Sequence, residues 1–125
     1  MTRVVYDAGA LIAAERGDRW MWRTHKVALL KDAVLVTTAP VVAQVSRSPR
    51  QARLHRFLGS CDVIGFVAED AHAVGKLLAG SGSSDVVDAH LALVADGGHV
   101  LTSDPADLQR LAECLTPAPI IKPLG

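Results

Sequence analysis

The sequence lacks the features that mark several protein classes. Its two cysteines, Cys61 and Cys114, lie far apart and form no CxxC or Cys/His pattern, so neither a zinc site nor a disulfide framework is predicted. We interpret both as buried thiols in a reducing compartment. The longest uncharged run, residues 33–46, is too short to cross a bilayer and contains Pro40. With no apolar leader at the N-terminus, the chain is expected to be cytoplasmic and free of membrane.

The chain also has a formal net charge of zero at pH 7. Thirteen Lys and Arg residues balance thirteen Asp and Glu residues, so any contact with nucleic acid must depend on local charge. What is present is an apolar fraction of 50% in 125 residues, without repeats or linkers. This size and composition predict one globular domain over residues 1–125.

Short β-rich runs alternate with helical patterns along the chain. Strands are predicted at residues 3–6, 34–37, 63–67 and 99–102, with a short fifth at 120–121. Helices are predicted at residues 10–16, 19–31, 39–45, 49–58, 69–79, 85–95 and 105–115, with a loop at 80–84. This alternation predicts a three-layer α/β/α fold with a mainly parallel sheet of four to five strands.

Aspartates follow two of the predicted strands. Asp7 comes directly after residues 3–6, and Asp104 comes shortly after residues 99–102. Ligands of open parallel sheets bind beyond the carboxyl ends of the strands, so both residues are expected at that edge. Asp85 and Asp88 are three residues apart on a predicted helix, which places both carboxylates on one face. Taken alone, this pair is also typical of a helix cap followed by a first-turn acid.

The four aspartates together predict a metal site. Like charges that crowd together repel one another unless a cation neutralises them. Oxygen ligands suit Mg²⁺ or Mn²⁺ rather than zinc. Such an ion can orient a phosphodiester, acidify a bound water and stabilise the developing charge. Phosphodiester hydrolysis is therefore the predicted chemistry.

Three segments, YDAGALIAA, SSDVVDAHLALVAD and VLTSDPADL, resemble in this order the motifs of PIN-domain ribonucleases, notably VapC-like toxins. The resemblance covers nearly the whole chain. It implies a PIN-like fold, Mg²⁺- or Mn²⁺-dependent cleavage of RNA, a cognate antitoxin partner and a homodimer. Asp7, Asp88 and Asp104 match three of the family's four acids, and Asp85 is a further acid beside them. All four are predicted to be catalytic and to bind the metal.

The family's glutamate is expected within PVVAQVSR, where this chain has Gln44. A glutamine keeps a carbonyl oxygen for a ligand or a water but lacks the negative charge. Either Asp85 supplies the missing charge, or metal binding is weaker than in the family, or the site is degenerate. The last interpretation leaves open a PIN-like binding module with weakened catalysis.

Two further groups of residues have more than one interpretation. Thr102 and Ser103 could hold a metal-bound water or a phosphate oxygen, although local turn bonding is the commoner role of such hydroxyls. Four arginines recur at every third residue and are expected along one flank of a helix, where they would contact RNA, bind the antitoxin or face solvent. They are Arg47, Arg50, Arg53 and Arg56.

An alternative interpretation, from another class of protein, is a receiver-type phospho-acceptor domain. It is suggested by Lys122 and Pro123, which follow the last predicted strand. Such a domain needs an acidic pair after its first strand and an aspartate after its third. This chain has only Asp7 at the first place and the more distant Glu69 and Asp70 at the second. Metal-dependent RNA cleavage that is lost on Asp88→Asn would separate a nuclease from both alternatives.

Overall fold

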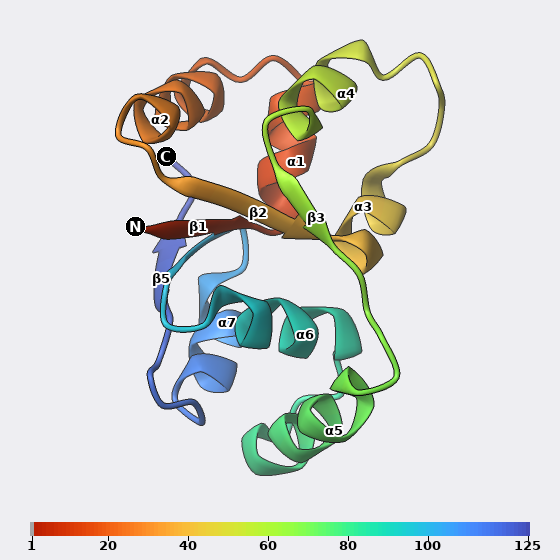
Figure 1. The fold of residues 1–125 in the computed structure, drawn as a ribbon, viewed down its shortest axis with the longest axis vertical. Coiled ribbons are helices and arrows are strands. Elements are labelled where there is room, and N and C mark those ends of the chain that lie inside the picture. The colour runs from red at the N-terminus through yellow and green to blue at the C-terminus, as the bar shows by residue number, and fades with distance from the viewer. Residues whose placement is uncertain (1) are drawn as a thin grey trace.

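The computed structural model describes residues 2–125 and has a five-stranded sheet between two layers of helices (Figure 1). The strands are β1 (Arg3–Tyr6), β2 (Val34–Thr38), β3 (Asp62–Ile64), β4 (His99–Thr102) and β5 (Ile120–Pro123). The helices are α1 (Ala8–Glu15), α2 (Arg19–Leu30), α3 (Ala39–Val45), α4 (Ala52–Leu58), α5 (Asp70–Ser81), α6 (Val86–Ala95) and α7 (Pro105–Ala112). The predicted three-layer α/β/α class is confirmed, and the sheet is entirely parallel.

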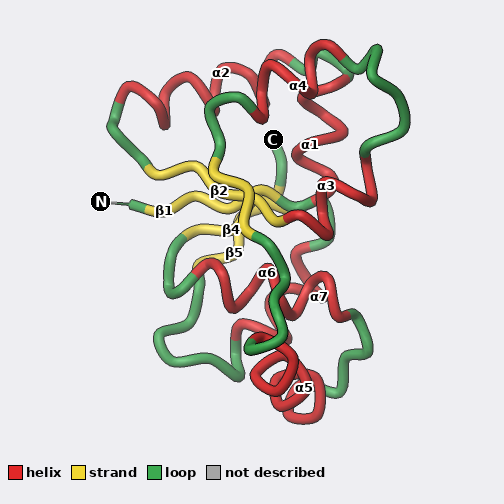
Figure 2. The backbone as a smooth tube through the Cα atoms, turned by 45° about the vertical axis from the view of Figure 1, so that its right-hand side comes forward, coloured by secondary structure: helices red, strands yellow, loops and turns green. Residues whose placement is uncertain are grey.

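The strand order β3-β2-β1-β4-β5 explains how the helices are distributed. The chain moves outward from β1 through β2 to β3, and then returns to β4 on the other side of β1. Right-handed crossovers therefore place α1 to α4 on one face and α5 to α7 on the other (Figures 1 and 2). The connections diverge between β1 and β4, and the carboxyl end of such a switch point is where open parallel sheets bind ligands.

The central strands are buried on both sides, as expected for continuous apolar runs in a parallel sheet. On the face covered by α1 to α4, the ring of Phe57 stacks on that of His25, with 4.0 Å between their centroids. The His25 Nδ1 atom lies 2.8 Å from the Tyr6 hydroxyl, and its Nε2 atom lies 2.6 Å from Ser60 Oγ. Burial lowers the pKa of His25 to about 4, so this histidine is neutral at physiological pH.

Helix α4 begins at Ala52, not at residue 49 as predicted. The Gln51 side chain holds the preceding segment as a turn, because its Oε1 accepts hydrogen bonds from the backbone N–H groups of Arg47 (2.8 Å) and Ser48 (3.1 Å). Arg47 and Arg50 therefore precede the helix. The prediction that four arginines share one helical flank is wrong for these two.

Strand β3 is also shorter than predicted, since it ends at Ile64 and not at residue 67. It is an edge strand whose partner is β2, and the last paired residues are Thr38 and Ile64. Because β2 turns directly into α3, residues 65–67 have no strand to pair with.

Helix α5 runs to Ser81, into the predicted loop, and ends where Gly82 adopts a φ of 74°. Helix α7 ends at residue 112, three residues early.

The two cysteines differ in their surroundings. Cys61 is half-buried, and burial raises the pKa of its thiol to about 12. Cys114 follows the early end of α7 and is exposed, so the prediction of a buried thiol is wrong for this residue.

No helix within residues 2–125 combines the length and the apolar character that a membrane crossing requires.

Candidate active site

Asp7 is fixed at the carboxyl end of β1, where it caps the N-terminus of α1. Its Oδ1 atom accepts a hydrogen bond from the Ala8 N–H at 2.7 Å, and its own N–H donates to the Leu101 carbonyl at 3.1 Å. Its Oδ2 atom accepts a hydrogen bond from the Thr102 hydroxyl at 2.8 Å. The residue is only 7% exposed. One carboxylate is thereby held by its own helix and by the neighbouring strand β4.

Thr102 links the two aspartates that follow β1 and β4. Its buried hydroxyl donates to Asp7 and accepts a hydrogen bond from the Asp104 N–H at 2.9 Å. The second bond is the local turn bonding that the sequence favours for Thr102. The first depends on the parallel pairing of β1 with β4, in which Tyr6 lies opposite Leu101.

Ser103 is exposed, and Gly9 of α1 lies directly against it. A Cβ atom added at Gly9 would collide with the Ser103 hydroxyl oxygen. A glycine is therefore required for this close approach between α1 and the end of β4. The Ser103 hydroxyl forms no hydrogen bond with another of residues 2–125, so it remains free to bind a ligand.

Asp85 and Asp88 lie at the start of α6. Asp85 is the N-cap, and its Oδ1 atom accepts a hydrogen bond from the Asp88 N–H at 3.0 Å. The helix-cap interpretation of this pair is therefore confirmed. Asp88 is half-buried in the first turn, whereas Asp85 is exposed. Helix α6 packs on β1, β2 and β4, which brings this turn toward the other two aspartates.

The four aspartates act on one another electrostatically. Burial raises the pKa of Asp88 to about 7, and the charges of Asp7, Asp85 and Asp104, together with a hydrogen bond to Asp85, contribute in the same direction. A hydrogen bond with the Asp107 carboxyl is the largest cause of a raised pKa at Asp104. Asp88 therefore lies within range of repulsion from each of the other three aspartates singled out in the sequence, and Asp107 lies beside Asp104.

The carboxylate oxygens of the four aspartates are suitable ligands for a hard divalent cation. The two ion pairs found within residues 2–125 join His90 to Asp70 and Arg110 to Asp107, so none of the four aspartates has an ion-pair partner, although the charge of Arg110 acts against the raised pKa of Asp104. As the side chains stand, no three acidic, histidine or cysteine groups of the described chain are close enough to enclose a metal. Mg²⁺ does not require such a cage, because it usually keeps several waters and binds through one or two carboxylates.

The other predicted site residues lie farther from this cluster. Gln44 is exposed on α3, the helix that begins at the same sheet edge, and no hydrogen bond joins its side chain to another part of the described chain. The Arg47 guanidinium donates to the carbonyls of Ala43 and Ser46. Arg53 and Arg56 lie on α4. Within residues 2–125, none of the four arginines forms an ion pair with the aspartates.

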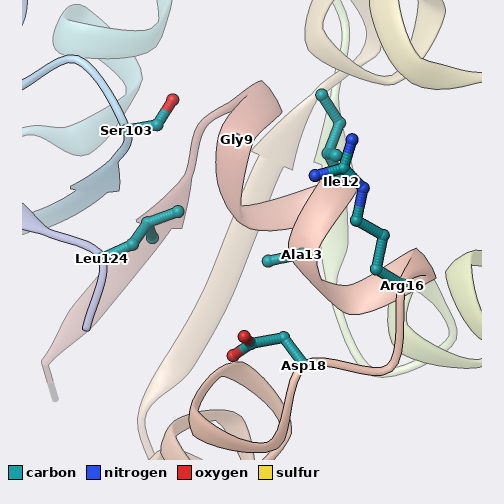
Figure 3. A pocket seen from close by; sticks show the side chains of 7 residues that line it. All are labelled: Gly9, Ile12, Ala13, Arg16, Asp18, Ser103 and Leu124. Carbon is teal, nitrogen blue, oxygen red and sulfur yellow. The ribbon is translucent and has the colours of Figure 1, made fainter.

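A hollow of about 500 Å³ adjoins the site between α1 and the C-terminal segment (Figure 3). Ser103 and Leu124 line one side, and Ala13 and Asp18 line the other. Only Ser103 was predicted as a site residue. The sequence carries no signal for the approach of Leu124, because it depends on a hydrogen bond from the Leu124 N–H to the Thr102 carbonyl beside β5.

Neither a protein-family model nor a curated protein matches the sequence. Among solved structures, the chain matches one chain in the crystal structure of VapBC2 from Rickettsia felis bound to a DNA fragment from their promoter. The TM-score is 0.73, and the match covers 98% of this chain and 99% of that chain at 17% identity. The chain has a PIN-like fold. The PIN-like fold implied by the three sequence motifs is thereby confirmed.

We predict that Asp88 destabilises the metal-free protein above neutral pH. Its pKa rises from 3.8 to about 7 on folding, so the folded state binds the proton more tightly than the unfolded state. Protonated Asp88 therefore stabilises the folded state. This stabilisation is complete below the unfolded-state pKa of 3.8 and is lost as the pH rises through the folded-state pKa of about 7. Without metal, Asp88→Asn should therefore melt several degrees above wild type at pH 8 but close to it at pH 4. Thermal unfolding in EDTA across this range tests the prediction, and a pH-independent difference would contradict it.

Proposed function

We propose that this protein is a metal-dependent endoribonuclease that hydrolyses RNA phosphodiester bonds at the carboxyl edge of β1 and β4. The observation that carries the proposal is the cluster of Asp7, Asp85, Asp88 and Asp104, whose negative charge is not balanced by any ion pair of the described chain. It lies at the topological switch point of a parallel sheet, where ligands are expected.

Asp7, Asp88 and Asp104 would hold the cation, Mg²⁺ or Mn²⁺, directly or through its bound waters, with Asp85 as the fourth acid. When bound, such an ion polarises a phosphate oxygen and lowers the pKa of a water. The chain's own contribution is orientation, because the Thr102 hydroxyl and the first turn of α1 hold the Asp7 carboxylate in one position. The exposed Ser103 hydroxyl would donate a hydrogen bond to a phosphate oxygen.

Incubation of the purified protein with structured RNAs tests the activity. Internal cleavage is expected with Mg²⁺ or Mn²⁺, no cleavage with EDTA, and recovery when metal is added in excess. Absence of cleavage with both metals would overturn the nuclease proposal. RNA binding without cleavage would favour instead a PIN-like binding module with weakened catalysis, the second candidate that Gln44 supports.

We further propose that the protein acts in the cytoplasm as the toxin of a toxin–antitoxin pair, binds a cognate antitoxin and forms a homodimer. The motif resemblance and the likeness in fold to a chain of VapBC2 support this role. Co-expression with the adjacent gene should yield a copurifying complex whose nuclease activity is suppressed. A monomer that is harmless when expressed alone would contradict it.

Replacement of Gln44 by glutamate tests whether this residue belongs to the metal site. A further carboxylate should raise the affinity for Mg²⁺ by about threefold to tenfold, since attraction for the cation grows with each negative charge. The same change should lower the metal-free melting temperature, and Mg²⁺ should restore it by binding the folded state. Calorimetric titration and thermal unfolding measure the two effects. If neither changes, Gln44 lies outside the site.

A further inference from the structure

A second hollow, of about 360 Å³, lies between the end of α1, the start of α2 and α4, and its lining is strongly cationic. Arg19 and Arg23 are one turn apart on α2, and Arg53 and Arg56 are one turn apart on α4, so each pair occupies one face of its helix. Four guanidinium groups therefore line one cavity in a chain whose net charge is zero.

These four arginines are not neutralised within the described chain. The ion pairs of residues 2–125 involve other residues, and none includes an arginine of the hollow. The two acids nearest to it in sequence, Glu15 and Asp18, keep their charges, but four arginines outnumber them and both carboxylates are bonded to backbone groups. Glu15 accepts from the Leu54 N–H at 2.7 Å, and Asp18 accepts from the Met21 N–H at 2.8 Å. The hollow is thus a local field of positive charge that can attract an anion.

The remaining lining residues, Gly17 and Trp22, give the hollow a defined shape. Gly17 has a φ of 74°, and a Cβ atom there would come within 3.2 Å of Arg53 Nε, so glycine allows the Arg53 side chain to lie against the turn. Trp22 is half-buried, and its ring N–H already donates to the Ala14 carbonyl at 2.9 Å. The ring also packs edge-on against Phe57, with 5.3 Å between their centroids, so the part of Trp22 that lines the cavity is the remaining exposed part of the ring.

We propose that this hollow binds the phosphate backbone of single-stranded RNA. Guanidinium groups bind phosphate through paired charge-assisted hydrogen bonds, and aromatic rings in basic grooves stack with unpaired bases. Positive charge alone would also suit an acidic peptide. The Trp22 ring in the wall favours a ligand that carries both phosphates and bases.

This inference rests on the proposed ribonuclease function. The position of the hollow relative to the acidic site indicates how it would help to bind the RNA substrate. The aspartates at the other end of α1 repel phosphates, so the substrate requires attraction elsewhere. Helix α1 has eight residues, which span roughly 12 Å at 1.5 Å per residue. An RNA strand anchored in the hollow would therefore reach the acidic edge within a few nucleotides.

The test measures binding without cleavage. A fluorescein-labelled, unstructured RNA oligonucleotide is titrated in EDTA with wild type and with Arg53→Gln/Arg56→Gln. The double variant should bind about tenfold more weakly, and its salt slope should fall by about 1.4, because each phosphate contact on a single strand contributes about 0.7. Intrinsic tryptophan fluorescence should change on RNA binding in the wild type.

The control variant Lys31→Gln/Lys76→Gln removes the same amount of charge elsewhere on the molecule. Its affinity for RNA should stay within about twofold of that of wild type, because screened distant charges contribute little.

Arg19→Gln/Arg23→Gln supplies a second variant should the first fail to fold by circular dichroism. Equal weakening in the lysine control, or unchanged binding in both arginine variants, would overturn the proposal. A poly-glutamate peptide that binds more tightly than the RNA, with the same dependence on these arginines, would also overturn it in favour of an acidic partner. Metal-dependent cleavage by wild type is scored separately. If wild type cleaves RNA but the arginine variants bind it as tightly as wild type, only the proposed role of the hollow is rejected. If RNA binding depends on these arginines but wild type does not cleave RNA, only the proposed nuclease function is rejected.

Discussion

Asp7→Asn is expected to lower metal-dependent RNA cleavage by about two orders of magnitude or more. Metal ions contribute several kcal/mol of charge stabilisation in such reactions, and each 1.36 kcal/mol corresponds to a factor of ten in rate. The Asp7 carboxylate is the most buried of the four acids and the one held from two sides. Loss of its charge should therefore weaken the site more than loss of the exposed Asp85.

The same substitution removes the acceptor for the Thr102 hydroxyl, but it also relieves the repulsion between Asp7 and Asp88, so we expect the fold to remain intact. Asparagine is as good an N-cap as aspartate, because its side-chain oxygen can still accept the hydrogen bond from the Ala8 N–H. Asp32→Asn is a matched control. Asp32 lies just before β2, at the amino edge of the sheet, and has a φ of 57°, which asparagine tolerates well. Its cleavage rate should equal that of wild type.

Single-turnover cleavage, the melting temperature and calorimetric Mg²⁺ titration should be measured for wild type and both variants. We expect Asp7→Asn to lose cleavage and metal affinity together while it melts within a few degrees of wild type. Cleavage at the wild-type rate in Asp7→Asn would show that the reaction takes place elsewhere on the molecule.

Local patterns in the sequence were sufficient to predict β1, β2, β4 and most of the helices. Strands β1 and β4 are apolar runs buried on both faces, and α2 begins and ends close to its predicted limits. The carboxyl-edge rule depends only on which residue follows each strand, so it identified Asp7 and Asp104 as neighbours. The spacing of Asp85 and Asp88 was also sufficient to place both at the start of one helix.

Features that depend on contacts distant in sequence were not predictable. The end of β3 is set by the last residue of β2 with which it can pair, and the start of α4 by the Gln51 side chain. The arginine-lined hollow requires the α1–α2 turn to meet α4, which no local pattern encodes. The Thr102 bond to Asp7 likewise requires β1 and β4 to be neighbours, although 95 residues separate the two side chains.

Thr102→Val tests that bond, and its expected effect is large on both stability and activity. Valine has nearly the shape of threonine but no hydroxyl, so the buried Asp7 Oδ2 loses a donor and the Asp104 N–H loses an acceptor. Hydrogen bonds to charged groups contribute about 1.5–3 kcal/mol, and an unsatisfied buried group costs about 1–3 kcal/mol. We expect the free energy of unfolding to fall by about 2–3 kcal/mol in the metal-free protein. The loss should be smaller with Mg²⁺, which would partly neutralise Asp7.

Thr102→Ser separates orientation of the aspartates from packing. Serine keeps the hydroxyl but lacks the buried methyl group, whose removal costs about 1 kcal/mol. If the hydroxyl positions Asp7 and Asp104 for catalysis, the serine variant should lose stability but keep most of its cleavage rate. The valine variant should lose about tenfold or more in kcat, because small displacements of catalytic groups are costly. Denaturant unfolding and single-turnover cleavage measure the two properties. If the two variants lose activity equally, the methyl group is the important part of Thr102, and its hydroxyl does not orient the acidic site.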